Sequence, residues 1–352
     1  MKKTILLKVD PNEPDLRKII VAANIIKKGG LVAFPTETVY GLGANVLNPK
    51  AVFSLFEAKN RPVDNPPIIH VENLGQIKYL AKKIPIKAKL LIDEFWPGPL
   101  TIILQRSKIT PKESTAGLDT IAIRMPQHKV ALALIKHSNC SIAAPSANLS
   151  GKPSPTLAKH VLDDLNGKID LILDGGPTGI GVESTVVNFT VDPPEVLRPG
   201  GISIEDLKKI IDDIKIHPFV IADTQLLLEK ISSPGMKHKH YAPKAKVILV
   251  EGAISSIVNK VVELSKKYML KELKVGILAT QETIKYYNTD VVKSLGSRFN
   301  LKVIAQNLFS LLREFDDENV EIIIAEGVPC EGLGLAVMNR LRKAAAYNIV
   351  KT

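Results

Sequence analysis

The stretch that decides the fold is LVAFPTETVYGLG, which spans Leu31–Gly43. It begins as a short apolar strand and continues at once into hydroxyl groups, one carboxylate and glycines. Small ligands usually bind at such strand ends in α/β sheets. One predicted helix later, the cluster Lys59-Asn60-Arg61-Pro62 adds two cations. Together these features predict a pocket for a small polar substrate beside a site for phosphate groups.

Composition indicates the class of protein. The chain has 352 residues, 45% hydrophobic and 24% charged, as expected for a globular protein of about two domains. Its formal charge of +11 favours nucleotide or RNA partners, although a generic basic surface gives the same value. Cys140 and Cys330 form no disulfide framework or zinc pattern, so we expect reduced, buried thiols. We find no signal peptide or membrane span and expect a cytoplasmic protein without membrane contact.

The order of strand-like and helical stretches predicts an α/β fold with two domains. In residues 1–214 several predicted strands follow one another with few helices between them. This favours a twisted, mixed, open sheet with helices over a regular βαβ array. Residues 247–352 alternate more regularly, which predicts a small parallel, doubly wound domain of the Rossmann type.

Residues 215–246 form the predicted linker. They lack hydrophobic periodicity and include Ser232–Pro243, SSPGMKHKHYAP, which is rich in turn formers and cations. A connection this long can also act as a lid over a binding site. His238 and His240 resemble a metal-ligand pair, but a lysine-rich linker is a poor context for a metal site.

Lys59 and Arg61 point to one phosphate site only if the helix ends between them. Two residues apart on a helix, their side chains would diverge by roughly 200°. Pro62 disfavours helical geometry at Arg61, so we expect the helix to end near Asn60 and an extended chain to follow. In an extended chain both cations face the same way. The alternative is a basic helix end that complements the helix dipole.

Other polar residues follow predicted strands. Ser146 and Asn148 come after an apolar strand, where extended geometry would align a hydroxyl with an amide; local turn capping is the alternative. Arg124 and Arg198 each end a strand, where a guanidinium can grip a carboxylate in bidentate fashion or form a surface ion pair. His70 also ends a strand and is more often a structural histidine than a catalyst.

A glycine-rich stretch, Asp174–Gly181, is neither a P-loop nor a dinucleotide fingerprint. It lacks the Gly-Lys-Ser/Thr ending, and a strand follows where a helix should. By itself it indicates a close backbone approach or a hairpin.

Taken in order, these motifs are far more specific than any one alone. The chain resembles the two-domain form of the L-threonylcarbamoyladenylate synthase family, with a YrdC-type catalytic domain. In the first domain the resemblance rests on Pro35–Gly43, Lys59-x-Arg61-Pro62, Ser146-x-Asn148, Glu183-Ser184-Thr185 and Arg198-Pro199-Gly200. In the second half it rests on Ser233–Pro243, Gly332-Leu333-Gly334 and Met338-Asn339-Arg340-Leu341.

The resemblance implies a nucleotidyltransferase. ATP, L-threonine and bicarbonate or CO2 would become threonylcarbamoyl-AMP and pyrophosphate, with Mg²⁺ bound to ATP. A separate transferase would then pass the threonylcarbamoyl group to the adenosine just 3′ of certain tRNA anticodons, and weak tRNA binding is a further expectation. No metal site is expected in the protein itself, although Glu183 is a guess for a magnesium ligand.

The resemblance also implies site residues. The catalytic set would be Lys59, Arg61, Ser146 and Asn148. Threonine would be bound by Thr36, His70, Arg124, the Ala144 backbone and Ser184. ATP would be bound by Lys59, Arg61, Val63, Thr120, Ser146, Asn148, Ser154, Arg198, Pro234 and Tyr241. Pro234 to Tyr241 would close over the nucleotide and exclude water from a fragile mixed anhydride.

Two other functions remain open from the sequence. One is an RNA-binding module, which predicts salt-sensitive affinity and no ATP turnover. The other is a carbamoyl-adenylate enzyme of metallocofactor maturation, although the chain lacks zinc-type cysteines and an acylphosphatase-like domain. Threonine-dependent release of pyrophosphate separates all three.

Overall fold

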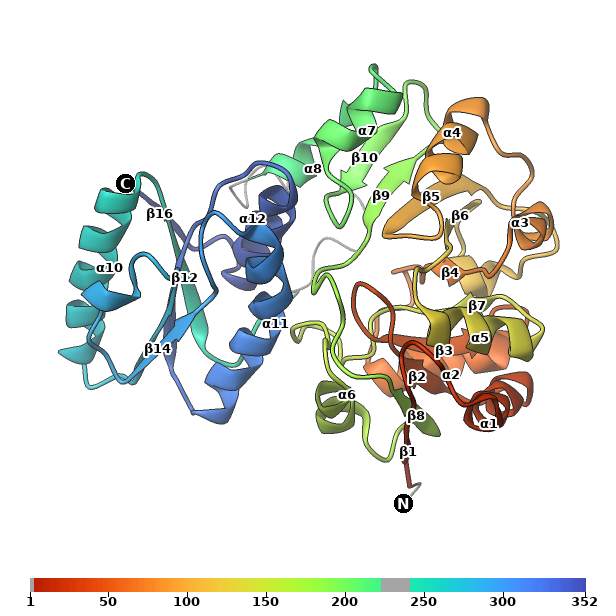
Figure 1. Cartoon of the computed structure of the whole chain (residues 1–352), viewed down its shortest axis with the longest axis horizontal. Coiled ribbons are helices and arrows are strands. Elements are labelled where there is room, and N and C mark those ends of the chain that lie inside the picture. Colours follow the sequence, from red (N-terminus) through yellow and green to blue (C-terminus); the bar gives the residue numbers. More distant parts are fainter. Residues whose placement is uncertain (1–2, 223–240) are drawn as a thin grey trace. The chain divides into compact units, whose positions relative to one another are not determined.

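The structure is a computed structural model that describes residues 3–222 and 241–352 (Figure 1). Contacts within the chain define two compact units. One consists of Met1–Ser150 and Ser154–His217, and the other of Gly151–Pro153 and Pro218–Thr352. The second unit therefore includes a short segment from the first half of the sequence.

The first unit is built on an eleven-stranded mixed sheet. In sheet order its strands are β1 (Ile5–Lys8), β8 (Leu171–Asp174), β2 (Val32–Phe34), β3 (Gly41–Asn45), β7 (Ile142–Ala143), β4 (Ile69–His70), β6 (Thr120–Arg124), β5 (Leu100–Gln105), β9 (Thr185–Asn188), β10 (Glu195–Arg198) and β11 (Lys215–Ile216). The sheet contains both parallel pairs, such as β4 with β6, and antiparallel pairs, such as β2 with β3. This confirms the predicted mixed α/β sheet.

Helices cover both faces of one half of this sheet. The unit contains α1 (Leu16–Lys27), α2 (Pro49–Lys59), α3 (Leu74–Leu80), α4 (Ile86–Phe95), η1 (Lys112–Thr115), α5 (Lys129–Ser138), α6 (Ala158–Leu165) and α7 (Ile204–Ile210). Buried residues of α1 and α5 pack on one side of β2 and β8, and those of α2 and α6 pack on the other. Strands that are buried on both faces read as continuous apolar runs, which is why LVAF is recognisable in the sequence.

The second unit contains a five-stranded sheet in which every pair is parallel. Its order is β14 (Val291–Ser294), β13 (Val275–Ala279), β15 (Ile322–Glu326), β12 (Lys246–Glu251) and β16 (Ile349–Lys351). Its helices are α8 (Pro218–Ile221), α10 (Ile254–Met269), η2 (Ile284–Tyr286), α11 (Leu301–Asp317) and α12 (Leu333–Ala344). α10 covers one face, and α11 and α12 cover the other (Figure 1). The predicted parallel second domain is confirmed.

One glycine of this sheet shows how closely a helix packs on it. A Cβ on Gly276 of β13 would lie 2.6 Å from a ring carbon of Phe315 on α11. Only a residue without a side chain fits such an approach. α11 therefore lies directly on the strand.

Several details differ from the sequence-based expectations. The short strands β1 and β11 and the helix α3 were not predicted, because each has too few residues to establish a hydrophobic period. β11 lies within the predicted linker 215–246 and pairs with β10. The expectation of buried thiols was wrong for Cys330, which is exposed, while Cys140 is partly buried. Within residues 3–222 and 241–352, none of the helices is long and apolar enough to cross a bilayer.

Candidate functional site

The loop that follows β2 is held by its own hydroxyl groups. Thr36 Oγ1 donates to the Val39 carbonyl at 2.6 Å and lies 2.9 Å from Thr38 Oγ1. The loop backbone also accepts hydrogen bonds from the glycine-rich stretch, since Ile180 N donates to Glu37 O at 2.8 Å and Gly181 N to Thr38 O at 3.1 Å. The close backbone approach that the glycines suggested is therefore made to this loop.

Arg124 reaches this loop from the end of β6. Its Nη1 donates to Thr38 Oγ1 at 2.9 Å and its Nε to the Gly98 carbonyl at 3.3 Å. Thr36 lies next to that hydroxyl, so two residues predicted to bind threonine come together from distant parts of the sequence. Arg124 is not a surface ion pair, because only 3% of the residue is exposed.

Glu37 lies in the same loop. It belongs to the Pro35–Gly43 motif, but no function was predicted for it. Its Oε2 is 2.6 Å from Arg124 Nη2, which makes a buried ion pair. The guanidinium N–H does not point along this line, and neither carboxylate oxygen accepts a hydrogen bond from the described residues. The carboxylate is therefore close to a positive charge but has all of its hydrogen-bonding capacity unused.

His70 lies beside Arg124, its register partner across β4 and β6. Burial, with a smaller contribution from the Arg124 charge, lowers the pKa of His70 to about 3. The ring is therefore neutral near pH 7, and Nδ1 lies 3.2 Å from the Ile68 carbonyl. When Nδ1 donates there, Nε2 is left as an acceptor. This geometry is that of a structural histidine whose Nε2 can still accept one hydrogen bond.

Ser146 and its neighbours form the adjacent wall. Gly41, directly after the loop, forms a β-bridge with Ser146, and Ala147 N donates to the Tyr40 carbonyl at 2.8 Å. Lys59 Nζ donates to the backbone carbonyls of Ser146 and Asn148. A continuous series of contacts thus runs from Arg124 through the loop to Ser146 and Lys59.

The end of α2 differs from the predicted extended exit. Asn60 is left-handed, with φ 50° and ψ 42°, and Arg61 N donates back to the Phe56 carbonyl at 2.9 Å. This glycine-like αL cap ends the helix, so strand-like alternation does not align the two cations. Instead Arg61 Nε donates to Asn65 O at 2.9 Å and Nη2 to Asn65 Oδ1 at 2.7 Å. The two cations are held by different segments.

Ser184 and Arg198 are in direct contact. Ser184 is fully buried, and Arg198 donates from Nε to its carbonyl at 3.0 Å and from Nη2 to its Oγ at 3.1 Å. Thr101 Oγ1 lies 2.8 Å from Ser184 Oγ. A Cβ on Gly200 would lie 2.2 Å from the Ser184 carbonyl carbon, which explains the glycine after Arg198-Pro199.

Two further polar residues join this region. Ser154 is buried, and its Oγ donates to Glu183 Oε1 at 2.5 Å. Tyr40 OH donates to the Gly176 carbonyl at 2.6 Å, which ties the loop to the glycine-rich stretch. Apart from its place in the motif, no feature of the sequence pointed to Tyr40.

The structure also shows where the other predicted residues of the first unit lie. Ala144 is buried, and its N–H donates to Ile68 O at 2.8 Å beside His70. Thr120 begins β6, at the opposite end of the strand from Arg124, and Val63 is 66% exposed.

Of the predicted linker residues with a proposed role, only Tyr241 lies in the part of the chain that the structure describes. Tyr241 belongs to the second unit, where its ring stacks on Phe309 at 5.3 Å. Pro234, His238 and His240 lie outside the described residues.

Among residues 3–222 and 241–352, no three His, Cys, Asp or Glu side chains gather as a metal site would require. The Glu183 carboxylate, our guess for a magnesium ligand, is engaged by Ser154.

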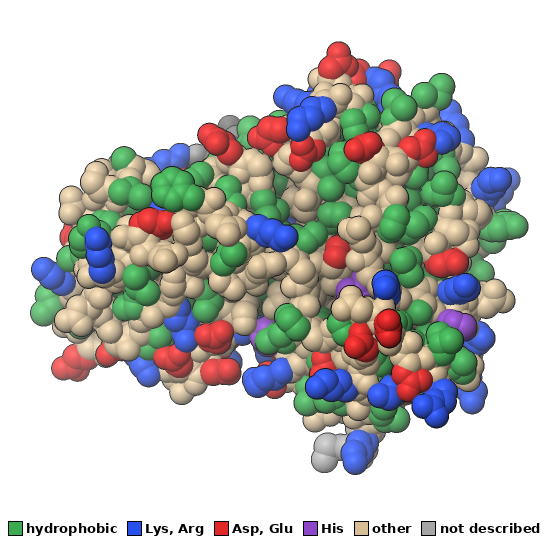
Figure 2. Space-filling model, in the orientation of Figure 1, with side chains coloured by type: hydrophobic (Ala, Val, Ile, Leu, Met, Phe, Trp, Pro, Cys, Tyr) green, Lys and Arg blue, Asp and Glu red, His purple; other side chains and the backbone are tan. Residues whose placement is uncertain are grey.

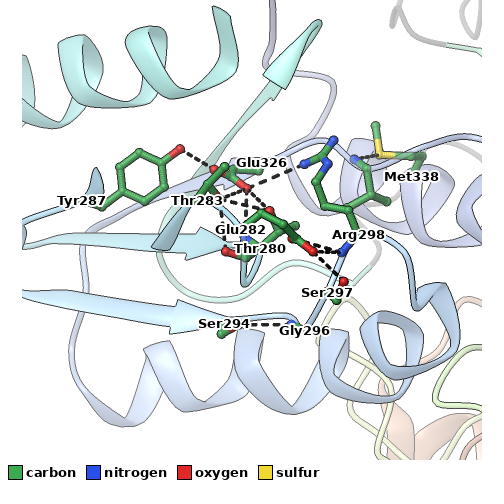
Figure 3. Close-up of polar contacts among 11 residues, drawn as sticks. Thr280, Glu282, Thr283, Tyr287, Ser294, Gly296, Ser297, Arg298, Glu326 and Met338 are labelled. Atoms are coloured by element: carbon green, nitrogen blue, oxygen red, sulfur yellow. Dashed lines mark hydrogen bonds and ion pairs between the residues drawn. The ribbon is translucent and has the colours of Figure 1, made fainter. Parts of the chain in front are cut away.

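A second polar cluster lies in the second unit, at the carboxyl ends of β13, β14 and β15 (Figure 3). Glu326 is fully buried at its centre. Its Oε2 accepts from Thr280 N and Oγ1, both at 2.9 Å, and from Thr283 Oγ1 at 2.8 Å, while Oε1 accepts from Tyr287 OH. Arg298 Nη1 lies 3.8 Å from Oε2. Hydrogen bonds saturate this carboxylate.

Comparison with known proteins identifies the family. A family model described as "Telomere recombination" matches residues 24–200, and one described as "Threonylcarbamoyl-AMP synthase, C-terminal domain" matches residues 202–346. A threonylcarbamoyl-AMP synthase of Pyrococcus abyssi is 52% identical over 95% of this chain and 96% of its own length. The chain belongs to the threonylcarbamoyl-AMP synthase family. The resemblance drawn from the motifs is confirmed.

Other members of the family are similar to this protein over nearly the whole chain. The threonylcarbamoyl-AMP synthase of Bacillus subtilis is 48% identical over 97% of this chain and 95% of its own length. A crystal structure of P. abyssi Sua5 complexed with L-threonine has 51% identity and a TM-score of 0.92, covering 99% of this chain and 100% of that one. The family likeness therefore extends over both units.

Proposed function

We propose that this chain makes threonylcarbamoyl-AMP from L-threonine, bicarbonate or CO2, and ATP, and releases pyrophosphate. Its relatives are named threonylcarbamoyl-AMP synthases, and one matched structure holds L-threonine. The observation that carries the proposal is the continuous set of contacts from Arg124 through the 36–41 loop to Ser146 and Lys59. These contacts support a site in which Arg124 binds a carboxylate and Lys59 binds phosphate.

The chemistry requires two steps that share this site. The threonine ammonium gives one proton to the solvent, and the resulting amine nitrogen bonds to the carbon of CO2 and releases a second proton to form the carbamate. With bicarbonate the amine forms the same carbamate, and one water leaves. An oxygen of the carbamate then attacks the α-phosphorus of ATP, the bond from that phosphorus to the α–β bridging oxygen breaks, and pyrophosphate leaves. The protein contributes mainly position and charge neutralisation.

The phosphate end of the site is assigned to the cations and amides near α2. Lys59 and Arg61 offset negative charge that develops on the phosphates, and Mg²⁺ arrives with ATP as part of the substrate. Ser146 and Asn148 hold the nucleotide near the α-phosphate. Arg198 adds a further donor beside Ser184. Ser154, Thr120, Val63, Pro234 and Tyr241 complete the proposed ATP site.

The threonine end of the site is assigned to the buried residues around β4 and β6. Arg124 binds the carboxylate of threonine, which the unused capacity of its Nη2 favours. Neutral His70 offers Nε2 as an acceptor to the threonine hydroxyl. Thr36, the Ala144 backbone and Ser184 line the remaining walls. All of these residues are buried, which suits a site that excludes water.

The product is suited to a later group-transfer reaction. A mixed carbamic–phosphoric anhydride is an activated acyl donor, so a separate transferase consumes it, here the one that modifies tRNA adenosine. The net charge of +11 allows weak contact with tRNA. On the face seen in Figure 2, however, Lys and Arg side chains are mixed with Asp and Glu. We therefore assign any sequence-specific tRNA recognition to the transferase.

The test is pyrophosphate release from ATP by the purified full chain, with and without L-threonine and bicarbonate. The proposal expects release that depends on both additions, together with a nucleotide product whose mass equals threonylcarbamoyl-AMP. An RNA-binding module would release no pyrophosphate. A carbamoyl-adenylate enzyme would depend on a carbamoyl donor and not on threonine.

A further inference from the structure

Two of the buried glutamates in the described part of the chain, Glu37 and Glu326, differ in what surrounds their oxygens. Glu326 accepts hydrogen bonds on both oxygens and is fully buried, which is the usual condition of a structural carboxylate (Figure 3). Glu37 is 9% exposed, yet neither of its oxygens accepts a hydrogen bond from the described residues. A buried acceptor without a donor is costly, so Glu37 needs an explanation of its own.

The neighbour of Glu37 is unsatisfied in the complementary way. Arg124 uses Nη1 and Nε for Thr38 and Gly98, but its Nη2 is buried and makes no hydrogen bond to the described residues. This nitrogen lies 2.6 Å from Glu37 Oε2. Unused acceptors and an unused donor of opposite charge therefore lie side by side.

The loop fixes the backbone on both sides of Glu37. Thr36 and Thr38 on either side are fixed by the hydrogen bonds between their hydroxyls and to Val39 and Arg124. The Glu37 carbonyl itself accepts from Ile180 N at 2.8 Å. The unsatisfied carboxylate is thus a built feature of the site and not a mobile surface group.

An α-amino acid supplies both missing partners from one carbon atom. Its carboxylate gives acceptors to Arg124, and its ammonium gives donors to Glu37. Both would be charge-assisted hydrogen bonds, which are stronger than neutral ones and stronger still away from water. A ligand with a carboxylate alone would satisfy Arg124 and leave Glu37 buried without a donor.

We propose that Glu37 binds the α-amino group of threonine. This inference deepens the proposed function and rests on it, because that function gives the amino group no partner. As ammonium, the group is held by its charge, so the site selects a zwitterion over a simple hydroxy acid. Once the ammonium has given one proton to the solvent, Glu37 accepts a hydrogen bond from one remaining N–H and so orients the nitrogen lone pair toward the carbon of CO2.

The test compares two ligands that differ only in the amino group. The full chain, without ATP, is titrated by calorimetry with L-threonine and with 3-hydroxybutanoate. Wild type is expected to prefer threonine roughly tenfold to a hundredfold, as expected for a charge-assisted hydrogen bond. In Glu37→Gln the preference falls close to one, while affinity for 3-hydroxybutanoate is unchanged.

Two further variants give the result its meaning. Glu326→Gln, which alters a buried glutamate of the second unit, keeps the preference for threonine. Glu37→Asp, with a shorter carboxylate, restores part of it, and this variant carries the test if Glu37→Gln does not fold. An equal preference in wild type and Glu37→Gln would overturn the inference and leave the proposed function standing. If wild type fails to bind threonine, the proposed function itself is wrong.

Discussion

The loop after β2 and the cluster around Glu326 are both buried, polar and placed at strand ends, but they are built oppositely. At Glu326 one carboxylate meets two threonines and a tyrosine, all contributed by the second unit. At Glu37 a carboxylate and a guanidinium are buried together, and neither Glu37 oxygen nor Arg124 Nη2 has a hydrogen-bond partner among the described residues. The carboxylate of the first arrangement is saturated, although Arg298 Nη1 beside it makes no hydrogen bond to the described residues, and for the unsatisfied carboxylate of the second we propose a ligand.

The contrast indicates how a buried charged side chain that stabilises the fold can be distinguished from one that serves function. Burial alone does not distinguish the two glutamates, since both are nearly inaccessible. Hydrogen-bond accounting does, because a native interior leaves few polar groups unsatisfied without a reason. Four predictions test this distinction, in order of decreasing expected effect.

Removal of the saturated carboxylate should destabilise the second unit. In Glu326→Ala the donors of Thr280, Thr283 and Tyr287 lose their acceptor and Arg298 loses its counter-charge, which should cost about 3–5 kcal/mol. The measurement is urea unfolding followed by circular dichroism. The single tryptophan, Trp96, lies in the first unit, so its fluorescence transition should move little. A control change of the exposed Glu331 to Ala should leave both transitions in place, and a shift of the Trp96 transition alone would contradict the assignment.

Replacement of the buried lysine should affect turnover more than folding. Lys59→Met keeps the apolar stem but removes the charge, and the loss of transition-state stabilisation should lower threonine-dependent pyrophosphate release roughly 10²-fold or more. The matched control is Lys50→Met, an exposed lysine of the same helix, which should keep its rate. A Lys59→Met enzyme as fast as the Lys50→Met enzyme would remove Lys59 from the site.

Acid should destabilise the first unit through His70. Its pKa is lowered to about 3 by burial, below the value of about 6.5 in the unfolded chain, so unfolding takes up a proton between these values. Stability is complete above pH 6.5 and is lost as pH falls, by about 2–3 kcal/mol at pH 4.5.

The check is the difference in unfolding free energy between pH 7 and pH 4.5, from Trp96 fluorescence in urea. His70→Gln should shrink this difference relative to wild type, and the partly exposed His137→Gln should not. An unchanged difference in His70→Gln would mean that the folded protein already protonates this ring.

The smallest effect is expected for the unsatisfied carboxylate. Glu37→Gln removes a group that accepts no hydrogen bond from the described residues, and Arg124 keeps Thr38 and Gly98. The change also removes the charge 2.6 Å from the buried Arg124 Nη2, so the free energy of unfolding of the variant should fall by about 1–2 kcal/mol, less than for the same change at Glu326, where hydrogen-bond donors also lose their acceptor. Equal costs at the two positions would erase the difference between the two glutamates.

Much of the site could be predicted because its residues sit at strand ends that are apolar in sequence. LVAF, the helix that ends at Lys59 and the strand that ends at Arg124 were all recognised. In the structure Thr36, Arg124, Ser146 and Lys59 are linked through the loop between Thr36 and Gly41. Glu37 was missed because a charged residue in a loop motif gives no signal of burial. Gly98 was missed because it contributes only a carbonyl.

The end of α2 shows a case in which residue spacing alone did not predict the backbone conformation. Pro62 correctly predicted that the helix would end near Asn60, but the αL conformation of Asn60 replaced the extended exit that was to align two cations. The cap depends on hydrogen bonds back to Phe56 and Glu57, which compete with extension and are not visible in residue spacing. Lys59 is instead held by carbonyls from a loop about ninety positions away (87 to Ser146 and 89 to Asn148).

The amino-acid sequence by itself determined the mixed and parallel sheets, the order of the motifs and the family to which they belong. These follow from hydrophobic period, strand-end chemistry and turn residues, which act over a few neighbouring positions. Only the tertiary structure decided which polar groups would be satisfied. Arg124 meets Thr38 across 86 positions, and whether Glu37 finds a donor depends on strand register and on loops from elsewhere in the chain. Local propensity cannot encode such distant pairings, because they arise only when the sheet has formed.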